Sequence, residues 1–330
     1  MFDLLKCNEI LKSELSYRLK QVEKAIFQDL VDDWWKVTNL PQSLRTALNK
    51  HCPLAIKVKF FPETSSRAIK ALLSLDDDLK VESVLMKHRD GRNTVCVSSQ
   101  VGCPLGCKFC ATGKMGFKRN LTTSEIVNQV LVFARLLKKQ NQRVTNVVFM
   151  GMGEPFLNTN NVLAAIMLLN DKEGFNLGAR HFSISTVGII EGIERLTDES
   201  PQVNLAISLH ATNDKLRSWL MPINKKYPLN QVMKAVDRYI QKTRRRVMLE
   251  YVMIGRVNDS PKEAEALAVL AKRPLCFVNL INYNPTGNFQ PSPIKKIIEF
   301  KRILEKHKIP VTQRYRFGQK VKAACGQLAG

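Results

Sequence analysis

Three cysteines lie close together in the stretch "GCPLGCKFCATG", where Cys103, Cys107 and Cys110 follow a C-x3-C-x2-C spacing. Thiolates at such short spacing bind metals. A structural zinc ion takes four ligands, usually from two separate pairs, and no second C-x2-C or H-x3-H pair follows in the sequence. Three thiolates suit an iron–sulphur cube with three irons bound by protein and a fourth open to a substrate. We therefore favour a reactive [4Fe-4S] cluster over a zinc site.

Two further cysteines raise the question of a reactive thiol. Cys325, in "VKAACGQLAG", is surrounded by alanine and glycine, so it has little to pack against and burial alone explains it poorly. Cys96, in "TVCVSS", alternates with its neighbours like any buried strand residue. The eight cysteines do not resemble a disulfide framework, because four of them fall within fifteen residues of a long chain.

The chain is strongly basic, with 51 Lys and Arg against 29 Asp and Glu and a net charge of +22. An excess of this size favours a polyanionic partner, most simply nucleic acid, over an ordinary basic enzyme. The basic residues are spread along the chain and not gathered on one amphipathic helix, which argues against a membrane surface. Neither a signal peptide nor an apolar run long enough to cross a bilayer is found, so we expect a cytoplasmic protein.

Six short apolar runs typical of β-strands follow residue 79, at 94–99, 146–150, 181–188, 204–210, 246–254 and 276–284. Helical patterns lie between them, and the first begins with a capping box at Thr122 and Glu125. Strand–helix alternation predicts a parallel sheet. The fold class is thus α/β, and six units predict a partial (β/α)6 barrel, although a doubly wound open sheet has the same local pattern.

The polar and glycine-rich segments favour the barrel. The cysteine loop, "GMGEP", "STVG", "SLH" and "NYNP" each come at the carboxyl end of a predicted strand. Parallel barrels build their active sites at that rim. Residues 1–78 are different: they have helical patterns and two short strand-like runs. We expect a small, mainly helical accessory domain at 1–78, and a catalytic core with a cysteine-bearing tail at 79–330.

Several longer motifs carry a resemblance to a known family. The cysteine loop, with Phe109 before its third cysteine, resembles the cluster motif of the radical S-adenosylmethionine (SAM) superfamily. From about residue 80 to its end, the chain is similar to the radical-SAM adenine methyltransferases of ribosomal RNA (the RlmN/Cfr family). The motifs are "VCVSSQVGCPLGCKFCATG", "FMGMGEPFLN", "SISTVGI", "LAISLHATND", "LMPIN", "VNLINYNP" and "AACGQLAG".

This resemblance implies radical methylation of an adenine carbon, with one [4Fe-4S] cluster per chain and two SAM molecules per turnover. Cys325 matches the methyl-carrying cysteine: one SAM methylates its thiolate, and a second supplies the radical that activates that methyl group for addition to the base. Glu82, in "KVESVLM", matches the proton acceptor, although by pattern alone it is a solvated charge. Cys96 matches the cysteine that releases the product through a transient disulfide with Cys325. An external electron donor and a thiol reductant are implied as partners.

The resemblance also implies which residues bind SAM. Gly153 and Glu154 would receive the amino group of SAM. Its ribose and methionine ends would be contacted by Ser185 and by the segment Ser208, Leu209 and His210. Asn284 would contact its adenine. Without the resemblance, "GMGEP" is a strand-to-helix turn, and His210 is a histidine at the rim whose hydrogen bonds are satisfied within the protein.

The implied substrates are 23S rRNA, at an adenine of the peptidyl-transferase-centre loop, and tRNA beside the anticodon. "GMGEPFLN" resembles the branch that methylates C2, because the C8 branch, which confers antibiotic resistance, tends to lack that proline. We expect a monomer, RNA contacts from residues 1–78, and phosphate contacts from the basic stretches 108–120, 242–247 and 314–322. A radical-SAM enzyme with a small substrate and a non-enzymatic RNA-binding module remain alternatives.

Overall fold

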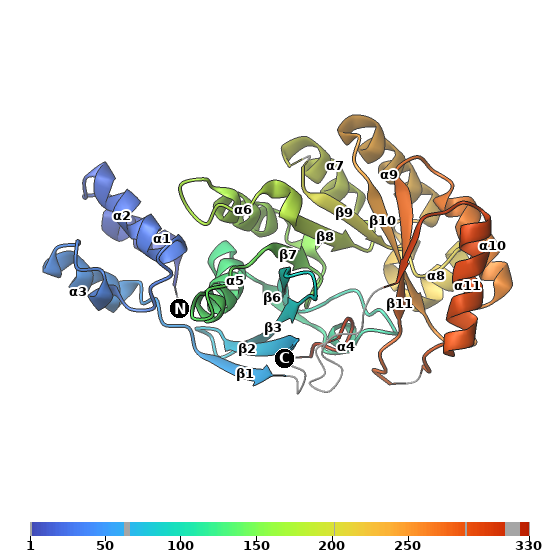
Figure 1. Cartoon of the computed structure of the whole chain (residues 1–330), viewed down its shortest axis with the longest axis horizontal. Helices are drawn as coiled ribbons and strands as arrows, with labels where there is room; N and C mark the ends of the chain where they lie inside the picture. Colours follow the sequence, from blue (N-terminus) through green and yellow to red (C-terminus); the bar gives the residue numbers. More distant parts are fainter. Residues whose placement is uncertain (1, 63–66, 201, 288, 314–323, 330) are drawn as a thin grey trace.

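The computed structural model describes residues 2–62, 67–200, 202–287, 289–313 and 324–329 of the chain. At its centre is one ten-stranded sheet in the order β1-β2-β3-β4-β7-β8-β9-β10-β11-β12. The sheet curves across the molecule, and helices such as α6, α7, α9 and α11 follow its outer side (Figure 1). The fold is therefore the α/β type that the alternation predicts and is a partial barrel, in which helices lie outside a curved sheet that does not close.

All six predicted strands are present and run parallel to one another. A seventh parallel strand adds to the far edge. These strands are β4 (Asn93–Val97), β7 (Asn146–Phe149), β8 (Phe182–Thr186), β9 (Asn204–Ser208), β10 (Val247–Met253), β11 (Cys276–Asn282) and β12 (Val311–Gln313). The helices between or after them are α5 (Thr123–Lys138), α6 (Thr159–Asn170), α7 (Ile190–Glu199), α8 (Asp214–Leu220), α9 (Leu229–Thr243), α10 (Pro261–Ala271) and α11 (Ile294–Lys306).

The near edge of the sheet is antiparallel. It consists of β1 (Val58–Pro62), β2 (Ala68–Ser74) and β3 (Lys80–Lys87), which continue the sheet from β4. The register places Lys70, Val84 and Cys96 in one row across β2, β3 and β4. Residues in one row share a face, and so do residues two apart on a strand, so Glu82 lies on this face too. The sheet thus continues across the predicted boundary at residue 79.

Helices α1 (Leu4–Leu11), α2 (Ser16–Phe27) and α3 (Gln42–His51) lie beyond this edge (Figure 1). The guanidinium of Arg135 on α5 donates to the carbonyls of Val31 at 2.7 Å and Leu54 at 2.9 Å, which attaches the helical segment to the core. The remaining short elements are α4 (Ala111–Lys114), the hairpin β5 (Gln100–Gly102) and β6 (Phe117–Asn120), and single 3-10 turns at Trp34–Lys36, Pro155–Leu157, Ala179–His181 and Pro222–Lys225.

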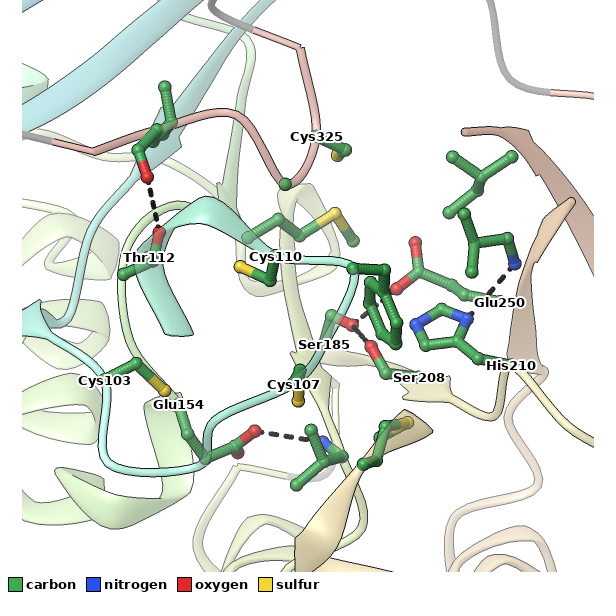
Figure 2. Close-up of a pocket in the computed structure, with 18 of the residues that line it drawn as sticks. Cys103, Cys107, Cys110, Thr112, Glu154, Ser185, Ser208, His210, Glu250 and Cys325 are labelled. Carbon is green, nitrogen blue, oxygen red and sulfur yellow. Dashed lines mark hydrogen bonds between the residues drawn. The ribbon is translucent and has the colours of Figure 1, made fainter. Parts of the chain in front are cut away.

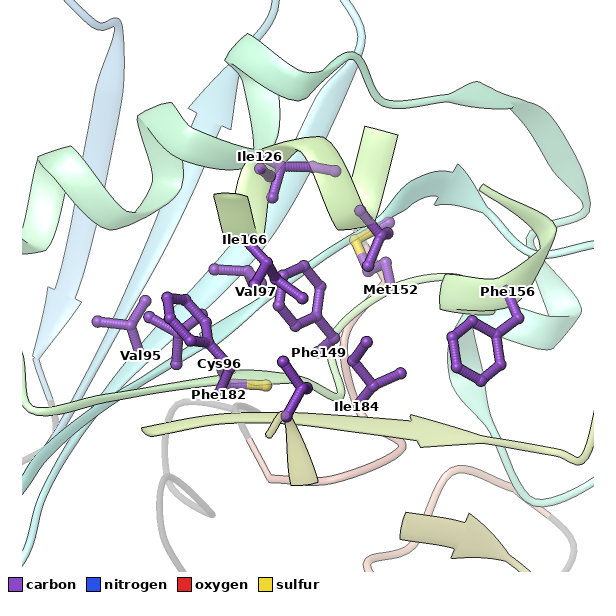
Figure 3. Packing of buried hydrophobic residues seen from close by; sticks show 14 of the residues in the cluster. Val95, Cys96, Val97, Ile126, Phe149, Met152, Phe156, Ile166, Phe182 and Ile184 are labelled. Carbon is purple, nitrogen blue, oxygen red and sulfur yellow. The ribbon is translucent and has the colours of Figure 1, made fainter. Parts of the chain in front are cut away.

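The core lies between the parallel strands and the helices. Figure 3 shows Ile126 of α5 and Ile166 of α6 packed toward Val97 and Phe149 of the sheet. Fully burying one such aliphatic or aromatic side chain contributes about 1.5–3 kcal/mol. The capping box predicted at the start of α5 is present, with each partner bonding the other's backbone. Within the described ranges, no helix has both the length and the apolarity to cross a bilayer.

Candidate active site

A cavity of about 990 Å³, counting the space at its open mouth, lies at the carboxyl ends of the parallel strands. Its wall comes from segments far apart in the sequence. Figure 2 shows the cysteine loop on one side, the ends of β8, β9 and β10 on another, and Cys325 of the carboxyl-terminal segment above them. The predicted site residues that line the cavity are Cys103, Cys107, Cys110, Gly153, Glu154, Ser185, Ser208, His210, Asn284 and Cys325.

The cysteine loop depends on glycine at two close approaches. Gly102 has φ +76°, and a Cβ there would lie 1.9 Å from the carbonyl oxygen of Gly116. A Cβ on Gly113 would lie 3.0 Å from the backbone nitrogen of Cys107. The absence of both side chains lets the backbone fold back on itself and direct the thiols toward the cavity.

The donor set fits an iron–sulphur cluster. Burial raises the pKa of the Cys103 thiol to about 12 and that of Cys107 well above its usual range, so both need a bound cation to become thiolates. A cube binds each thiolate through a different iron and leaves its fourth iron open to a ligand. Three thiols that line one cavity suit this arrangement.

Glu154 is a buried carboxylate on the cavity wall. Its Oε2 accepts from the Val187 N–H at 2.9 Å and its Oε1 from the Phe156 N–H at 3.1 Å. Burial raises its pKa to about 7 despite these hydrogen bonds. An ammonium group in the cavity would favour its ionised form, as an amino-acid ligand requires. Gly153 has φ +95°, and a Cβ there would lie 2.5 Å from that of Gln100.

The ends of β8, β9 and β10 bring three polar side chains together. The Ser185 hydroxyl donates to Oε2 of Glu250 at 2.5 Å and lies 3.1 Å from the Ser208 hydroxyl. This group can offer hydroxyls and a carboxylate to a polar ligand such as a ribose. Glu250 was not predicted, although a carboxylate within the apolar run "RVMLEYVMI" is a detectable signal.

His210 is buried with a positive φ of +60°. Its Nδ1 accepts from the Val252 N–H at 3.2 Å, so in the neutral ring the proton is on Nε2. Burial, with the nearby Arg217 cation as a second cause, lowers its pKa to about 3. The ring of Phe109 meets it edge-on at 4.9 Å. His210 is thus a neutral, fixed hydrogen-bond donor.

Leu209 differs from its two neighbours, because its side chain is buried in the core and does not line the cavity. Sequence reasoning also missed Arg217, which is fully buried. Its guanidinium donates to the carbonyls of Val187 at 2.6 Å and Leu209 at 3.1 Å. It therefore joins the ends of β8 and β9, which carry the cavity-lining side chains. No motif or residue spacing in the sequence indicates this role of Arg217.

The segment that carries Cys325 is attached to the cysteine loop. The Ala111 N–H donates to the Gly326 carbonyl at 2.7 Å, and the Thr112 hydroxyl donates to the Leu328 carbonyl at 2.6 Å (Figure 2). On the opposite side, the Asn284 amide donates to the Cys325 carbonyl at 3.3 Å. These contacts hold the Cys325 thiol at the cavity wall.

Glu82 and Cys96 lie outside the cavity lining, on the face of β3 and β4 described above. Glu82 is buried; its Oε1 accepts from Lys70 at 2.7 Å and its Oε2 from the Ala329 N–H at 3.0 Å. Cys96 is buried and not in a disulfide with Cys325. The basic stretch 314–322 lies outside the described residues, whereas 108–120 and 242–247 are described.

Comparison with known proteins points to one family. Residues 97–268 match the model of the radical SAM superfamily. The chain is 43% identical, over 99% of its length and 95% of the relative's, to the probable dual-specificity RNA methyltransferase RlmN of Dictyoglomus turgidum. It is 45% identical, over 97% of its length and 91% of the relative's, to the probable dual-specificity RNA methyltransferase RlmN of Bacillus licheniformis. A radical SAM methyltransferase from Sphaerobacter thermophilus superposes with a TM-score of 0.95 at 42% identity, covering 99% of both chains.

Proposed function

We propose a function from one premise: this chain belongs to the radical SAM superfamily and, within it, to the RlmN family of dual-specificity RNA methyltransferases. It methylates C2 of an adenine in 23S rRNA and of the adenine beside the anticodon of tRNA. The net charge of +22 suits a polyanionic substrate. None of the eight cysteines, all of which lie within the described residues, is in a disulfide, which suits the reducing cytoplasm, where these RNAs are found.

One observation carries this proposal: Cys325 lines the same cavity as Cys103, Cys107 and Cys110. A thiol that only filled space would have no reason to face the three cluster-type cysteines from the other end of the chain. We assign to Cys325 the role of carrying the methyl group on its Sγ as S-methylcysteine. The attachments through Gly326 and Leu328 keep this sulphur at the cavity wall.

The three loop cysteines would hold one [4Fe-4S] cluster, and two SAM molecules would be used in each turnover. When bound, the cluster and SAM supply the electron and the organic radical that a carbon as unreactive as adenine C2 requires. The protein's own residues bind and orient. Glu154 offers a carboxylate to the amino group of SAM, Ser185 and Ser208 offer hydroxyls to its ribose, and His210 donates from Nε2.

Release of the product is assigned to Glu82 and Cys96. They lie on one face of β3 and β4, and the carboxyl-terminal segment reaches this face, since the Ala329 N–H donates to Glu82. Glu82 would take the proton from the attacked carbon. The Cys96 thiolate would then attack Sγ of Cys325 and break its bond to the methylene carbon on the base. That carbon would leave with the electron pair and take up a proton to become the methyl group, and an external thiol system would reduce the Cys96–Cys325 disulfide.

We assign the chain to the branch that methylates C2, and not C8, because of the segment "GMGEP". Pro155 begins a 3-10 turn directly after Glu154, whose side chain accepts the first free N–H of that turn. The proline thereby fixes the backbone next to the proposed amino-group site. The C8-methylating branch remains the second candidate within the family. We further propose a monomer that takes its electrons from an external donor.

The test is a single turnover with SAM that carries a deuterated methyl group, using anaerobically reconstituted enzyme and a 23S rRNA fragment. We expect the label on the peptide containing Cys325 before RNA is added, and afterwards on C2 of one adenine by mass mapping. Label passing directly from SAM to RNA, or an unlabelled Cys325 peptide, would refute the methyl-carrying role. Label on C8 would assign the chain to the other branch.

A further inference from the structure

A row of aromatic rings leads from the cavity to the surface. Tyr283 lines the cavity, and its ring lies 6.1 Å from that of Phe289. The Phe289 ring is 5.7 Å from the indole of Trp219, and the ammonium of Lys108 lies 4.5 Å from the centre of that indole. Neither Trp219 nor Phe289 was singled out by the sequence motifs, and neither lines the cavity itself.

The backbone around Trp219 is fixed to the cavity wall. Trp219 is the second-last residue of α8, and the Lys108 N–H donates to the carbonyl of Leu220 at 3.0 Å. Lys108 lies between Cys107 and Phe109 of the cysteine loop, and Met221 lines the cavity. The indole therefore has a set position relative to the place where a target base would be held.

The indole remains largely accessible in this position. Trp219 is 45% exposed, although tryptophan is among the residues that gain most from burial. The Phe289 ring stands nearly perpendicular to the indole and the Lys108 ammonium lies over the indole, so the exposed part of the ring is next to a positive charge. This combination is what single-stranded nucleic acids require: a ring for the base to stack on and a cation for the phosphate.

We propose that Trp219 and Lys108 form a stacking platform for an RNA base that neighbours the target adenine, and so hold the flanking nucleotide while the target base is in the cavity. This inference rests on the proposed function. A base that enters the cavity must leave its stack, and its neighbour then loses a stacking partner. The Trp219 indole replaces that partner at the cavity mouth. The ammonium of Lys108 neutralises the phosphate between the two nucleotides.

The test measures anaerobic binding of the holoenzyme to a 23S rRNA fragment carrying the target adenine, and to fragments with an abasic residue at each flanking position in turn. Base–aromatic stacking of this kind corresponds to roughly tenfold in affinity. We expect Trp219→Ala to bind intact RNA about tenfold more weakly and Trp219→Phe to retain most of the affinity. One abasic position should weaken wild type tenfold and leave Trp219→Ala unaffected.

Controls separate this role from a structural one. Met167→Ala removes a 69% exposed apolar side chain from α6 and should bind every RNA as wild type does. The chain has three tryptophans, of which Trp34 is buried and Trp35 and Trp219 are exposed. In a Trp35→Phe protein, Trp219 is therefore the one exposed tryptophan, and stacking of a base on it should quench the tryptophan fluorescence when RNA is added. The platform would be overturned if Trp219→Ala lost the same affinity for every abasic RNA as for intact RNA, or if RNA left the tryptophan fluorescence unquenched. Adenine methylation is measured on the wild-type holoenzyme from the same preparation, so a result that overturns the platform leaves the proposed function standing.

Discussion

The backbone N–H of Ala329 donates a 3.0 Å hydrogen bond to Oε2 of Glu82, although the two residues are 247 positions apart in the sequence. The other carboxylate oxygen is paired with Lys70 at 2.7 Å. One carboxylate therefore receives a donor from the segment that carries Cys325 and another from the sheet. The carboxylate proposed as the proton acceptor is thus in direct contact with the segment that carries Cys325.

The role of Glu82 can be tested by Glu82→Gln. The amide keeps the size of the side chain but cannot take a proton from the attacked carbon. We expect a covalent enzyme–RNA product to accumulate, which is measured as a shifted band on a denaturing gel. Lys70→Met, which keeps Glu82, should turn over without such a band. If Glu82→Gln is slow yet yields no covalent product, Glu82 is not the proton acceptor.

Each loop cysteine should be required for the cluster. Replacing Cys103, Cys107 or Cys110 by Ser should reduce bound iron from about four atoms per chain to near zero, because a cube held by only two thiolates is labile. Cys276→Ser is the matched control, since Cys276 is a buried thiol on β11 that does not line the cavity. It should retain the iron and the brown colour. A colourless wild-type protein that contains zinc would contradict the cluster.

Gly153→Ala should impair SAM binding. Its φ of +95° disfavours any side chain, and its Cβ would also meet the backbone nitrogen of Gln100 at 2.9 Å. Gly91→Ala is the control, because Gly91 has φ +85° but nothing within 4 Å of the added Cβ. Left-handed backbone alone costs about 1–2 kcal/mol. We expect urea unfolding to show about that loss for Gly91→Ala and a larger one for Gly153→Ala, with weaker SAM binding by calorimetry only in the latter. If Gly153→Ala and Gly91→Ala lost the same free energy of unfolding, Gln100 would be shown to move aside for the added Cβ.

His210 should make the fold sensitive to acid. Its pKa of about 3 in the folded protein lies below the value of about 6.5 in an unfolded chain. The unfolded state therefore binds more protons between these values, and the stabilisation is complete above pH 6.5 and decreases as the pH falls toward 3. Between pH 7.5 and 5.5, wild type should lose about 1.4 kcal/mol more stability than His210→Gln. Equal losses in anaerobic urea unfolding would show that His210 is protonated in the fold.

The sequence indicated the parallel strands because their signal is local: each is a short apolar run ending in a polar or glycine-rich turn. Their carboxyl ends then had to meet at one rim, which is why so many predicted residues line one cavity. The two strand-like runs predicted within residues 1–78 are β1 and β2, but their antiparallel pairing with β3 was not predicted, because the contact of Glu82 with Lys70 depends on the register between strands. The contact of Ser185 with Glu250, 65 residues apart, has no local signal at all. Arg217 was missed for the same reason, since its partners are four backbone carbonyls and the side chain of Asn224, brought together only by the fold.

The ten-stranded sheet also limits where this chain can be recombined with its relatives. Because β1 and β2 continue through β3 into β4, a junction at residue 79 would take β2 and β3 from different parents, and with them the paired residues Lys70 and Glu82. Side chains that pack across the two strands would then no longer be matched to each other. A hybrid that takes its amino-terminal helices from another parent should be joined ahead of Val58, so that every strand is inherited from a single parent.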